Sequence, residues 1–307
     1  MNQDVLMESQ KFMGADRVRC ICCDASSFAG TQFCCQCKMP ISLSESADSR
    51  EVTRMFLPVI GGRGVGKTVY LGMLLDLLLK GKQGIIGQPG NPGTIEAHRR
   101  AIASLKRRRF PPKTGTESEY WDWIQADLRL GEESEHPISW ISPDPAGESV
   151  LMEIEHPGCF PALQASVAKS SGVVWLIDAP SVKENSPSEE LLAAKLAVYV
   201  HKNVRRSGPE RKTVDIPIAI VFTKTDACPE AAQNPKQFAS KSLTGFYGYL
   251  QDHVPKHRFF SSMAVGSVVQ LADEFGGGFF PMHVQPKGIV EPFAWVCSSA
   301  LAPQSEE

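Results

Sequence analysis

The sequence has no apolar run long enough to cross a bilayer and no large charge of either sign. Its longest apolar stretch, Tyr70 to Leu79, falls short of the roughly 20 residues that a membrane helix needs. The net charge of −2 gives no overall attraction to nucleic acid or to an anionic membrane, so any basic surface must be local. The first ten residues carry Asp4 and Glu8 and lack the apolar segment of a signal peptide. We therefore expect a cytoplasmic protein without a transmembrane segment.

The composition is that of a folded chain. Of the 307 residues, 42% are hydrophobic and 21% are charged, which is enough apolar material for a large core. Internal repeats are lacking as well. In a reducing cytosol, nine cysteines favour metal binding over disulfides.

Six of the nine cysteines lie close together near the N-terminus. Four of them form two C-x-x-C turns, which can place four thiolates tetrahedrally around Zn²⁺ at about 2.3 Å. The predicted zinc ligands are Cys20, Cys23, Cys34 and Cys37. Cys22 and Cys35 are surplus. A unit this short has almost no core, so the metal would supply most of its folding energy.

The rest of the chain alternates apolar strands with helical patterns, which favours an α/β fold with a doubly wound, mostly parallel sheet. Strands are expected at Met55–Ile60, Pro137–Ser142, Gly172–Ala179, Ile216–Thr223 and His257–Ser262. Helices are expected at Lys67–Lys80, Ser188–Arg206, Pro235–Val254 and Glu291–Ala300. Pro58 fits the first strand poorly, because a central strand needs that N–H. The predicted division is a short or disordered segment over 1–19, a zinc ribbon over 20–40, a Ser-rich linker over 41–51 and a P-loop domain over 52–303.

Residues 61–68 fit G-x-x-x-x-G-K-[ST] at every fixed position, between an apolar strand and an apolar helix. That context predicts a phosphate-binding loop, whose backbone N–H groups curl around phosphate oxygens. The expected nucleotide contacts here are Gly61, Arg63, Gly64, Val65, Gly66, Lys67, Thr68 and Val69. Lys67 would reach the β- and γ-phosphates, and the Thr68 hydroxyl would hold Mg²⁺.

Two further motifs follow in order along the chain. Asp144 to Gly147 fit D-x-x-G at a strand end, where the carboxylate can hold the Mg²⁺ shell and the Gly147 N–H can touch the γ-phosphate. Thr223, Lys224 and Asp226 fit [NT]-K-x-D, in which the aspartate accepts hydrogen bonds from guanine. Adenine would leave that carboxylate unpaired, at a cost of several kcal/mol when it is desolvated.

With these motifs in order, the chain resembles the Ras-like, TRAFAC-class P-loop GTPases from about Val52 to Leu301. The preceding zinc ribbon makes it look like the prokaryotic double-GTPase group, which implies a role in multi-component conflict or defence systems. The broader resemblance implies a GTP/GDP switch with Mg²⁺ as cofactor, whose protein partners are chosen by nucleotide state. Ser262 lies where the family's base-cradling loop should be, although Ser-Ser-Met departs from the usual Ser-Ala-Lys.

Two further positions of the family pattern are less regular. Glu148 stands where many members carry a water-orienting Gln, so hydrolysis by the isolated chain is expected to be slow. The switch I threonine that completes the Mg²⁺ site is not unique: Thr114 is favoured, with Thr116 and Thr94 as alternatives. The expected catalytic residues are thus Lys67, Glu148 and Thr114.

Two other functions stay open. The strand ending at Asp178 could serve a P-loop ATPase or kinase, with that carboxylate on Mg²⁺, although such a protein does not need T-K-T-D. A GTP-binding interaction module with little hydrolysis is the other alternative, and Glu148 is its best support. The basic run from Arg99 to Arg109 has three interpretations: a solvated helix face, a source of an arginine for the phosphates, or a surface for nucleic acid or an acidic partner.

Overall fold

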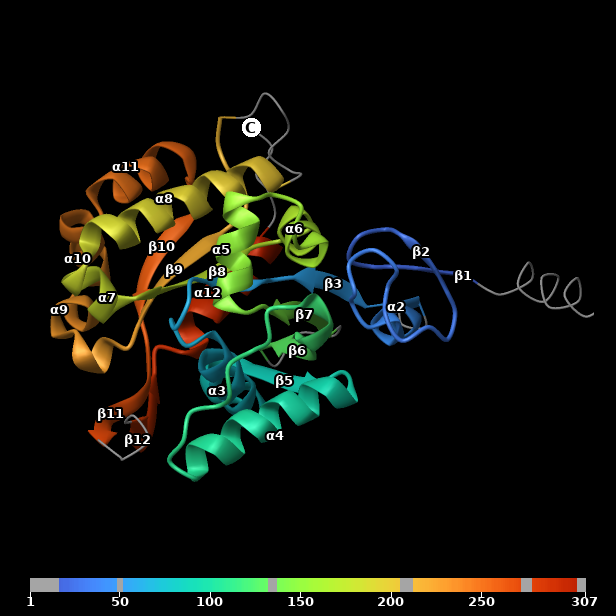
Figure 1. The fold of residues 1–307 in the computed structure, drawn as a ribbon, viewed down its shortest axis with the longest axis horizontal. Helices are drawn as coiled ribbons and strands as arrows, with labels where there is room; N and C mark the ends of the chain where they lie inside the picture. The colour runs from blue at the N-terminus through green and yellow to red at the C-terminus, as the bar shows by residue number, and fades with distance from the viewer. Residues whose placement is uncertain (1–16, 49–51, 132–136, 205–211, 272–277, 303–307) are drawn as a thin grey trace, which may run out of the picture.

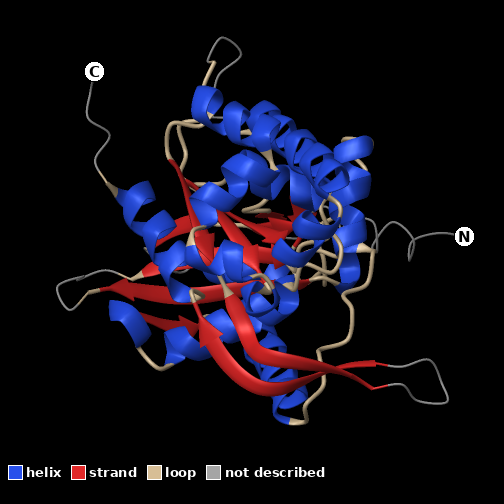
Figure 2. Cartoon of the chain, turned by 90° about the vertical axis from the view of Figure 1, so that its left-hand side faces the viewer, coloured by secondary structure: helices blue, strands red, loops and turns tan. Residues whose placement is uncertain are grey.

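A computed structural model describes residues 17–48, 52–131, 137–204, 212–271 and 278–302. A central sheet has helices on both faces, and a small cysteine-rich unit lies at one end of the molecule (Figure 1). A long β-hairpin projects from the body (Figure 2). Within these ranges, no helix is both long and apolar enough to span a membrane.

The elements follow one another in a mainly alternating order. The strands are β1 Arg17–Arg19, β2 Ser26–Phe28, β3 Thr53–Phe56, β4 Val59–Gly61, β5 Ile85–Pro89, β6 Asp122–Leu130, β7 Ile138–Asp144, β8 Val173–Asp178, β9 Ile218–Thr223, β10 His257–Ser261, β11 Met263–Leu271 and β12 Gly278–Lys287. The helices are α2 Ile41–Asp48, α3 Lys67–Leu79, α4 Pro92–Lys106, α5 Gly147–Glu155, α6 Pro161–Ala168, α7 Ala179–Glu184, α8 Ser186–Asn203, α9 Pro229–Gln233, α10 Pro235–Ser242, α11 Thr244–His253 and α12 Val290–Leu301.

The sheet consists of two four-stranded parts that meet at Pro58. One part has the order β10-β9-β8-β4 with all strands parallel; the other has the order β3-β7-β6-β5. Strands β3 and β7 are parallel, whereas β6 runs antiparallel to both β7 and β5. The predicted strand Met55–Ile60 is therefore split into β3 and β4, because Pro58 has no N–H for the ladder. The Pro58 carbonyl still accepts from Val174 N at 3.1 Å and extends the β4–β8 ladder, while Val59 N donates to Ser142 Oγ of β7 at 3.2 Å and joins the two parts.

Successive side chains of β8 point alternately toward the two layers of helices that cover the sheet. Val173, Trp175 and Ile177 pack in the cluster that contains α6, α8, α10 and α11. Val174 and Leu176 pack in the cluster that contains α3 and α12. A strand buried on both faces has a continuous apolar sequence, so the predicted doubly wound fold is confirmed. The parallel strands also bring the loops after β4, β7, β9 and β10 to one edge of the sheet.

The segment predicted as a linker over residues 41–51 is helix α2 in its described part. Ile41 and Leu43 are buried, and Ile21 N donates to Ser44 Oγ at 3.1 Å. The linker prediction was therefore wrong over Ile41–Asp48, where the apolar residues anchor the helix to the cysteine-rich unit. Residues 17–19 of the predicted N-terminal segment form β1, while 1–16 and 49–51 lie outside the described residues.

Other regions also differ from the sequence-based expectation, among them the unexpected helices α4, α5 and α6. The helix predicted over Pro235–Val254 is two helices, α10 and α11, which are separated at Leu243. The antiparallel strands β5 and β6 were not expected. Nor was the hairpin of β11 and β12, which presents Val268 and Phe279 to solvent.

Candidate functional site

The phosphate loop has the backbone that its sequence predicts. Gly64 and Gly66 adopt φ values of +71° and +90°, a region where side chains are strained. A Cβ on Gly61 would lie 2.6 Å from the Leu176 carbonyl oxygen, so this position also needs glycine. The loop runs directly into α3, whose free N–H groups then face the loop's interior. Between β4 and α3, the chain forms a turn with the geometry that can bind an anion.

Lys67 lies inside this turn. Its Nζ is 3.0 Å from the carbonyl oxygens of both Gly61 and Gly62, and its side chain is almost fully buried. Burial lowers the pKa of Lys67 to about 8, against the attraction of Asp144 and Glu148. A buried ammonium group needs anionic partners. Phosphate oxygens in the turn would provide them.

All three predicted Mg²⁺ ligands meet beside the loop. Thr68 Oγ1 donates to Asp144 Oδ2 at 2.8 Å and lies 3.2 Å from Thr114 Oγ1. Asp144 Oδ1 is buried and has no hydrogen-bond partner within the described chain. Burial also raises the pKa of Asp144 to about 6. Oxygen ligands around an unpaired carboxylate oxygen suit Mg²⁺, so the residues present fit this ion.

The structure also distinguishes between the three candidate threonines by their contacts. Thr114 is beside Thr68, as described above. Thr94 is buried in α4, where its Oγ1 accepts from Gln125 N at 2.8 Å. The Thr116 carbonyl accepts from Ser149 Oγ at 2.7 Å, which ties it to α5 instead.

The D-x-x-G turn rests directly on the phosphate loop. A Cβ on Gly147 would lie 2.5 Å from Arg63 Cα and 2.6 Å from the Gly62 carbonyl oxygen. The next residue, Glu148, forms an ion pair with Arg63, with 2.9 Å between Oε1 and Nε. Both sequence-predicted residues therefore lie at the phosphate loop.

The base-reading motif is connected to the phosphate loop by hydrogen bonds. Thr223 Oγ1 donates to the Val65 carbonyl at 2.9 Å. Thr225 Oγ1 donates to the Ser262 carbonyl at 3.1 Å, which brings the loop after β10 to the same edge. Asp226 is partly buried, and desolvation raises the pKa of its carboxyl group. Hydrogen bonds thus connect the phosphate loop to the loop after β9, and that loop to Ser262 after β10.

Asp178 has a role that the sequence did not indicate. Its carboxylate forms an ion pair with Lys224 Nζ and accepts from Ser181 N at 3.3 Å, which caps α7. Lys224 sits at φ +55°, and the ion pair holds its side chain in place at the base-reading loop. An Asp at the end of β8 was visible in the sequence, but only as a metal ligand of an ATPase. The structure instead places it with the base-reading residues.

The basic run forms an exposed face of α4 and the turn that follows. Arg99 pairs with Glu96 on the same helix, with 3.6 Å between the charged atoms. Arg100 forms an ion pair with Asp122 of β6. These contacts favour the solvated helix face among the three interpretations.

Comparison with known families identifies the chain. The sequence model of the Double-GTPase 1 family matches residues 58–212, half of the chain, from the phosphate loop through the helix after β8. The chain belongs to the Double-GTPase 1 family. It is therefore a GTP-binding P-loop protein. No curated protein matches the sequence.

Solved structures of GTP-binding proteins show a distant likeness to this chain. The GTPase-like domain of S. cerevisiae Ski7 bound to GTP is 14% identical, with a TM-score of 0.42 over 85% of this chain and 53% of that one. The receptor complex SRb-GTP/SRX of Chaetomium thermophilum is 15% identical, with a TM-score of 0.39 over 71% and 93%. Roco2 RocCORdC of Methanosarcina barkeri bound to GDP is 12% identical, with a TM-score of 0.35 over 70% of this chain. The chain spans 44% of the length of that last structure.

The Double-GTPase 1 protein also has the predicted four-cysteine cluster. The Sγ atoms of Cys20, Cys23, Cys34 and Cys37 all lie within 4.8 Å of one another. Cys20 and Cys37 are 3.6 Å apart and Cys23 and Cys34 are 3.5 Å apart. Thiolates on a tetrahedral Zn²⁺ at 2.3 Å are separated by about 3.8 Å, so the cluster fits zinc. Cys22 and Cys35 lie outside it and contact the carbonyls of Ala162 and Ser26.

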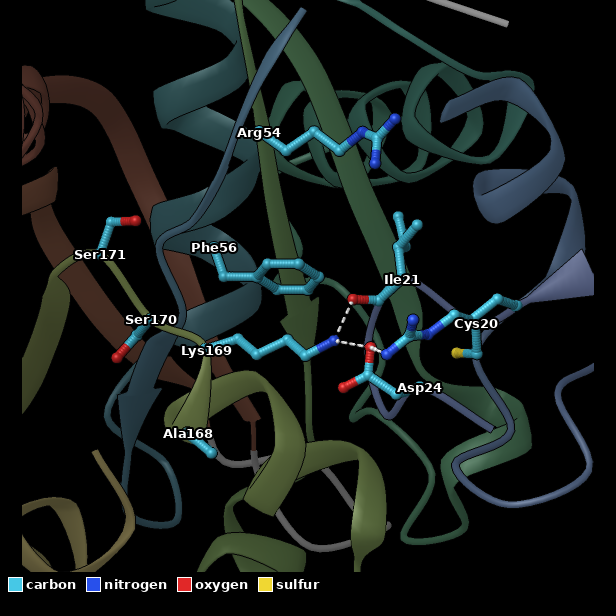
Figure 3. A pocket seen from close by; sticks show the side chains of 10 residues that line it. Cys20, Ile21, Asp24, Arg54, Phe56, Ala168, Lys169, Ser170 and Ser171 are labelled. Carbon is cyan, nitrogen blue, oxygen red and sulfur yellow. Dashed lines mark hydrogen bonds and ion pairs between the residues drawn. The ribbon is translucent and has the colours of Figure 1, made fainter. Parts of the chain in front are cut away.

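The cysteine-rich unit packs against the GTPase core beside α6. Lys169 Nζ, just after α6, donates to the Ile21 carbonyl at 2.9 Å and to Asp24 Oδ1 at 2.8 Å (Figure 3). Arg19 reaches the same carboxylate at 3.3 Å. A cavity of about 500 Å³ lies at this junction, and Phe56 of β3 forms part of its wall. The two units are thus in direct contact around the half-buried side chain of Lys169.

Proposed function

We propose that this protein is a switch that binds GTP with Mg²⁺, hydrolyses it slowly on its own, and selects protein partners by its nucleotide state. The observation that supports it best is the convergence of Thr68, Thr114 and Asp144. Thr114 comes from the loop after α4, and Asp144 from the end of β7. A Mg²⁺ ion there, bound also to the γ-phosphate, would hold the Thr114 loop, and loss of that phosphate would release it.

The chain's own residues have separate tasks in this proposal. Lys67 and the N–H groups of the phosphate loop bind the phosphates. Asp226 accepts from the guanine ring, and Ser262 supports the base-reading loop from β10. When bound, Mg²⁺ supplies positive charge to the phosphate oxygens. Thr68, Thr114 and the unpaired oxygen of Asp144 would hold the ion.

The same proposal assigns a separate role to each unit of the chain. Residues 52–303 would form the nucleotide unit, and Zn²⁺ in the four-cysteine cluster would hold the preceding ribbon in shape. The close packing of the ribbon on α6 gives the nucleotide unit a route to a partner. A cytoplasmic role in a prokaryotic conflict or defence system remains the expectation that the family resemblance gives.

A phosphate-release assay with the full chain tests the activity. Multiple-turnover release from GTP is expected to require Mg²⁺ and to be lost in Thr68→Ala, which removes a metal ligand and a bond to Asp144. Thr116→Ala is the matched control, because its hydrogen bond with Ser149 Oγ is made by the backbone carbonyl, which the substitution keeps. Release that is equal with ATP, or equal in the Thr68 variant, would show that the proposal is wrong.

A GTP-binding interaction module with little hydrolysis is the second candidate. The observation in its favour is that Glu148, at the position for orienting water, is held by Arg63. In that case, GTP would bind tightly and remain intact through many hours of incubation. The same assay therefore separates the two candidates, because binding and phosphate release are measured on one sample.

A further inference from the structure

Arg63 and Glu148 lie next to each other at the phosphate site, although the motifs do not specify the residue at either position. Arg63 occupies a variable position of G-x-x-x-x-G-K-T, and Glu148 follows the glycine of D-x-x-G. Their side chains form an ion pair, with 2.9 Å between Nε and Oε1. The backbones beneath them are fixed at contact distance, since even a Cβ on Gly147 would overlap Arg63 Cα. The pair therefore depends on both loops being in place.

The ion pair bridges the two loops between which the γ-phosphate must lie. The phosphate loop surrounds the phosphates, and the D-x-x-G glycine offers its N–H to the last of them. Lys67 Nζ lies on the carbonyls of Gly61 and Gly62, immediately before Arg63 in the loop. A γ-phosphate bound there would be close to both the guanidinium of Arg63 and the carboxylate of Glu148.

The pair is also weak enough to exchange partners. The side chain of Arg63 is 65% exposed and that of Glu148 is 37% exposed. Exposed ion pairs stabilise a protein by about 0–1 kcal/mol, because water screens both charges. A phosphate group carries more charge than a carboxylate and accepts two parallel N–H bonds from a guanidinium. Phosphate should therefore displace Glu148 from Arg63.

We propose that Arg63 is a built-in γ-phosphate-sensing arginine. It pairs with Glu148 when the γ-phosphate is absent, and it binds the γ-phosphate when GTP is present. The inference rests on the proposed GTP hydrolysis and assigns that reaction a further catalytic residue. It also explains how a site can have Glu148 next to a triphosphate: the arginine between them offsets both negative charges.

The exchange gives each residue one task in hydrolysis. Arg63 stabilises the negative charge on the phosphoryl oxygens, as an arginine supplied by a partner does in other GTPases. The released Glu148 accepts a hydrogen bond from the attacking water and orients it. The water oxygen bonds to the γ-phosphorus, the bond to the bridging oxygen breaks with its electron pair leaving on GDP, and the water proton passes to the released phosphate.

The test compares the binding of GTP and GDP with single-turnover phosphate release in four proteins: wild type, Arg63→Ala, Arg63→Lys and Glu148→Ala. Arg99→Ala is the matched control, because Arg99 is an exposed arginine in a similar ion pair on α4. Arg63→Ala should lower the release rate by about 10³-fold, the lower end of what a supplied arginine contributes. It should weaken the binding of GTP by about tenfold and change the affinity for GDP by less than about twofold.

The other variants distinguish the effect of the positive charge at position 63 from the effect of the guanidinium geometry. Arg63→Lys should recover part of the GTP preference but little of the rate, because lysine lacks the two-pronged geometry. Glu148→Ala should bind GTP several-fold more tightly, since the competitor of the phosphate for Arg63 is gone, and should release phosphate more slowly. Arg99→Ala should match the wild type in all three measurements.

The results that would overturn this proposal differ from those that would overturn the proposed function. An Arg63→Ala protein that hydrolyses GTP as fast as the wild type, or faster, would overturn the proposal, as would an unchanged ratio of GTP to GDP affinity. In those cases the proposed function survives. A wild-type protein that neither binds nor hydrolyses GTP would overturn both.

Discussion

The nucleotide site and the four-cysteine cluster are both built from loops, but different forces hold these loops. The phosphate loop, the D-x-x-G turn and the base-reading loop follow β4, β7 and β9, strands whose residues are fully buried. Among the described residues, the strands of the cysteine unit are β1 and β2, each of three residues, and their side chains are mostly exposed. The first site is therefore held by the core of the sheet. We expect the second to depend on Zn²⁺ bound by the four cysteines and on its contact with α6.

This difference means that the two sites should respond differently to the same kind of damage. Removing one nucleotide contact should lower affinity while the loops keep their shape, because the strands beneath them remain. Removing zinc ligands should unfold the unit itself, because little else supports it. The junction around Lys169 is the place where damage to one unit could reach the other.

The largest effect is expected from removing two zinc ligands. Purified wild-type protein should contain about one Zn²⁺ per chain, and Cys20→Ser with Cys23→Ser should contain none. Structural zinc contributes about 10–16 kcal/mol to folding of such units, so the region from β1 to α2 should become sensitive to protease. The affinity for GTP should change by less than about threefold, because the nucleotide loops rest on the sheet. Metal analysis, limited proteolysis and GTP titration check the three parts.

The exposed Cys35 outside the cluster provides the control. Cys35→Ser should keep the zinc and the protease resistance. Wild-type protein without zinc, when purified without chelator, would contradict the metal assignment. Collapse of GTP binding in the double variant would instead show that the two units do not stand apart.

Lys67→Ala is expected to have the largest effect on the nucleotide site. It removes a buried charged donor whose phosphate bonds are each worth about 1.5–3 kcal/mol. GTP should therefore bind about 100-fold more weakly or worse, while thermal unfolding stays close to that of the wild type. Lys80→Ala at the end of the same helix is the control, since Lys80 is exposed and pairs only with Asp76 among the contacts described here. Near-normal GTP affinity in Lys67→Ala would contradict the assignment of the loop.

A smaller, more selective effect is expected at the base-reading loop. Asp226→Asn should weaken GTP by about 2 kcal/mol, or roughly 30-fold, because an amide cannot accept from both guanine donors. Xanthine triphosphate should bind better than to the wild type, since the variant offers a donor where the base now accepts. Competition titrations with the two nucleotides measure this change. The exposed Asp252→Asn should leave both affinities unchanged; loss of GTP binding without any gain for xanthine would count against base recognition by Asp226.

The smallest effect is expected at the junction between the units. Lys169→Ala removes the bonds to the Ile21 carbonyl and to Asp24, and should cost about 1 kcal/mol. A cost of that size lowers Tm by about 1.5 °C in a chain of 307 residues, because the unfolding entropy is about 2.1 cal/mol/K per residue. Lys195→Ala is the matched control, because its ion pair with Glu155 is more exposed. An equal Tm change in both variants would mean that Lys169 does not join the units.

Prediction from the sequence was most accurate for features formed by residues that are close together in the chain. The phosphate loop, D-x-x-G, T-K-T-D and the paired C-x-x-C turns are each contiguous, so their residue order alone indicates their role. Pro58 was recognised as unsuitable for a central strand, and the structure shows the strand split there. The family assignment and the doubly wound fold follow from these signals.

Features that depend on tertiary contact were missed. Helix α2 has a Ser-rich sequence typical of a linker, and it is anchored by the burial of Ile41 and Leu43, which composition does not show. The ion pair of Arg63 and Glu148 joins two loops that are far apart in the chain. Asp178 looked like a metal ligand, because nothing in the sequence brings it to Lys224. In each case, a distant segment determines the role of the residue.

The most direct test of the account is a titration of the full chain with GTP and ATP, each with and without Mg²⁺. We predict that GTP binds at least about 100-fold more tightly than ATP, because adenine leaves Asp226 unpaired. Removing Mg²⁺ should weaken GTP markedly, because Asp144 would then face the phosphates without a cation. Equal affinities for GTP and ATP, or binding of GTP that is indifferent to Mg²⁺, would contradict the account.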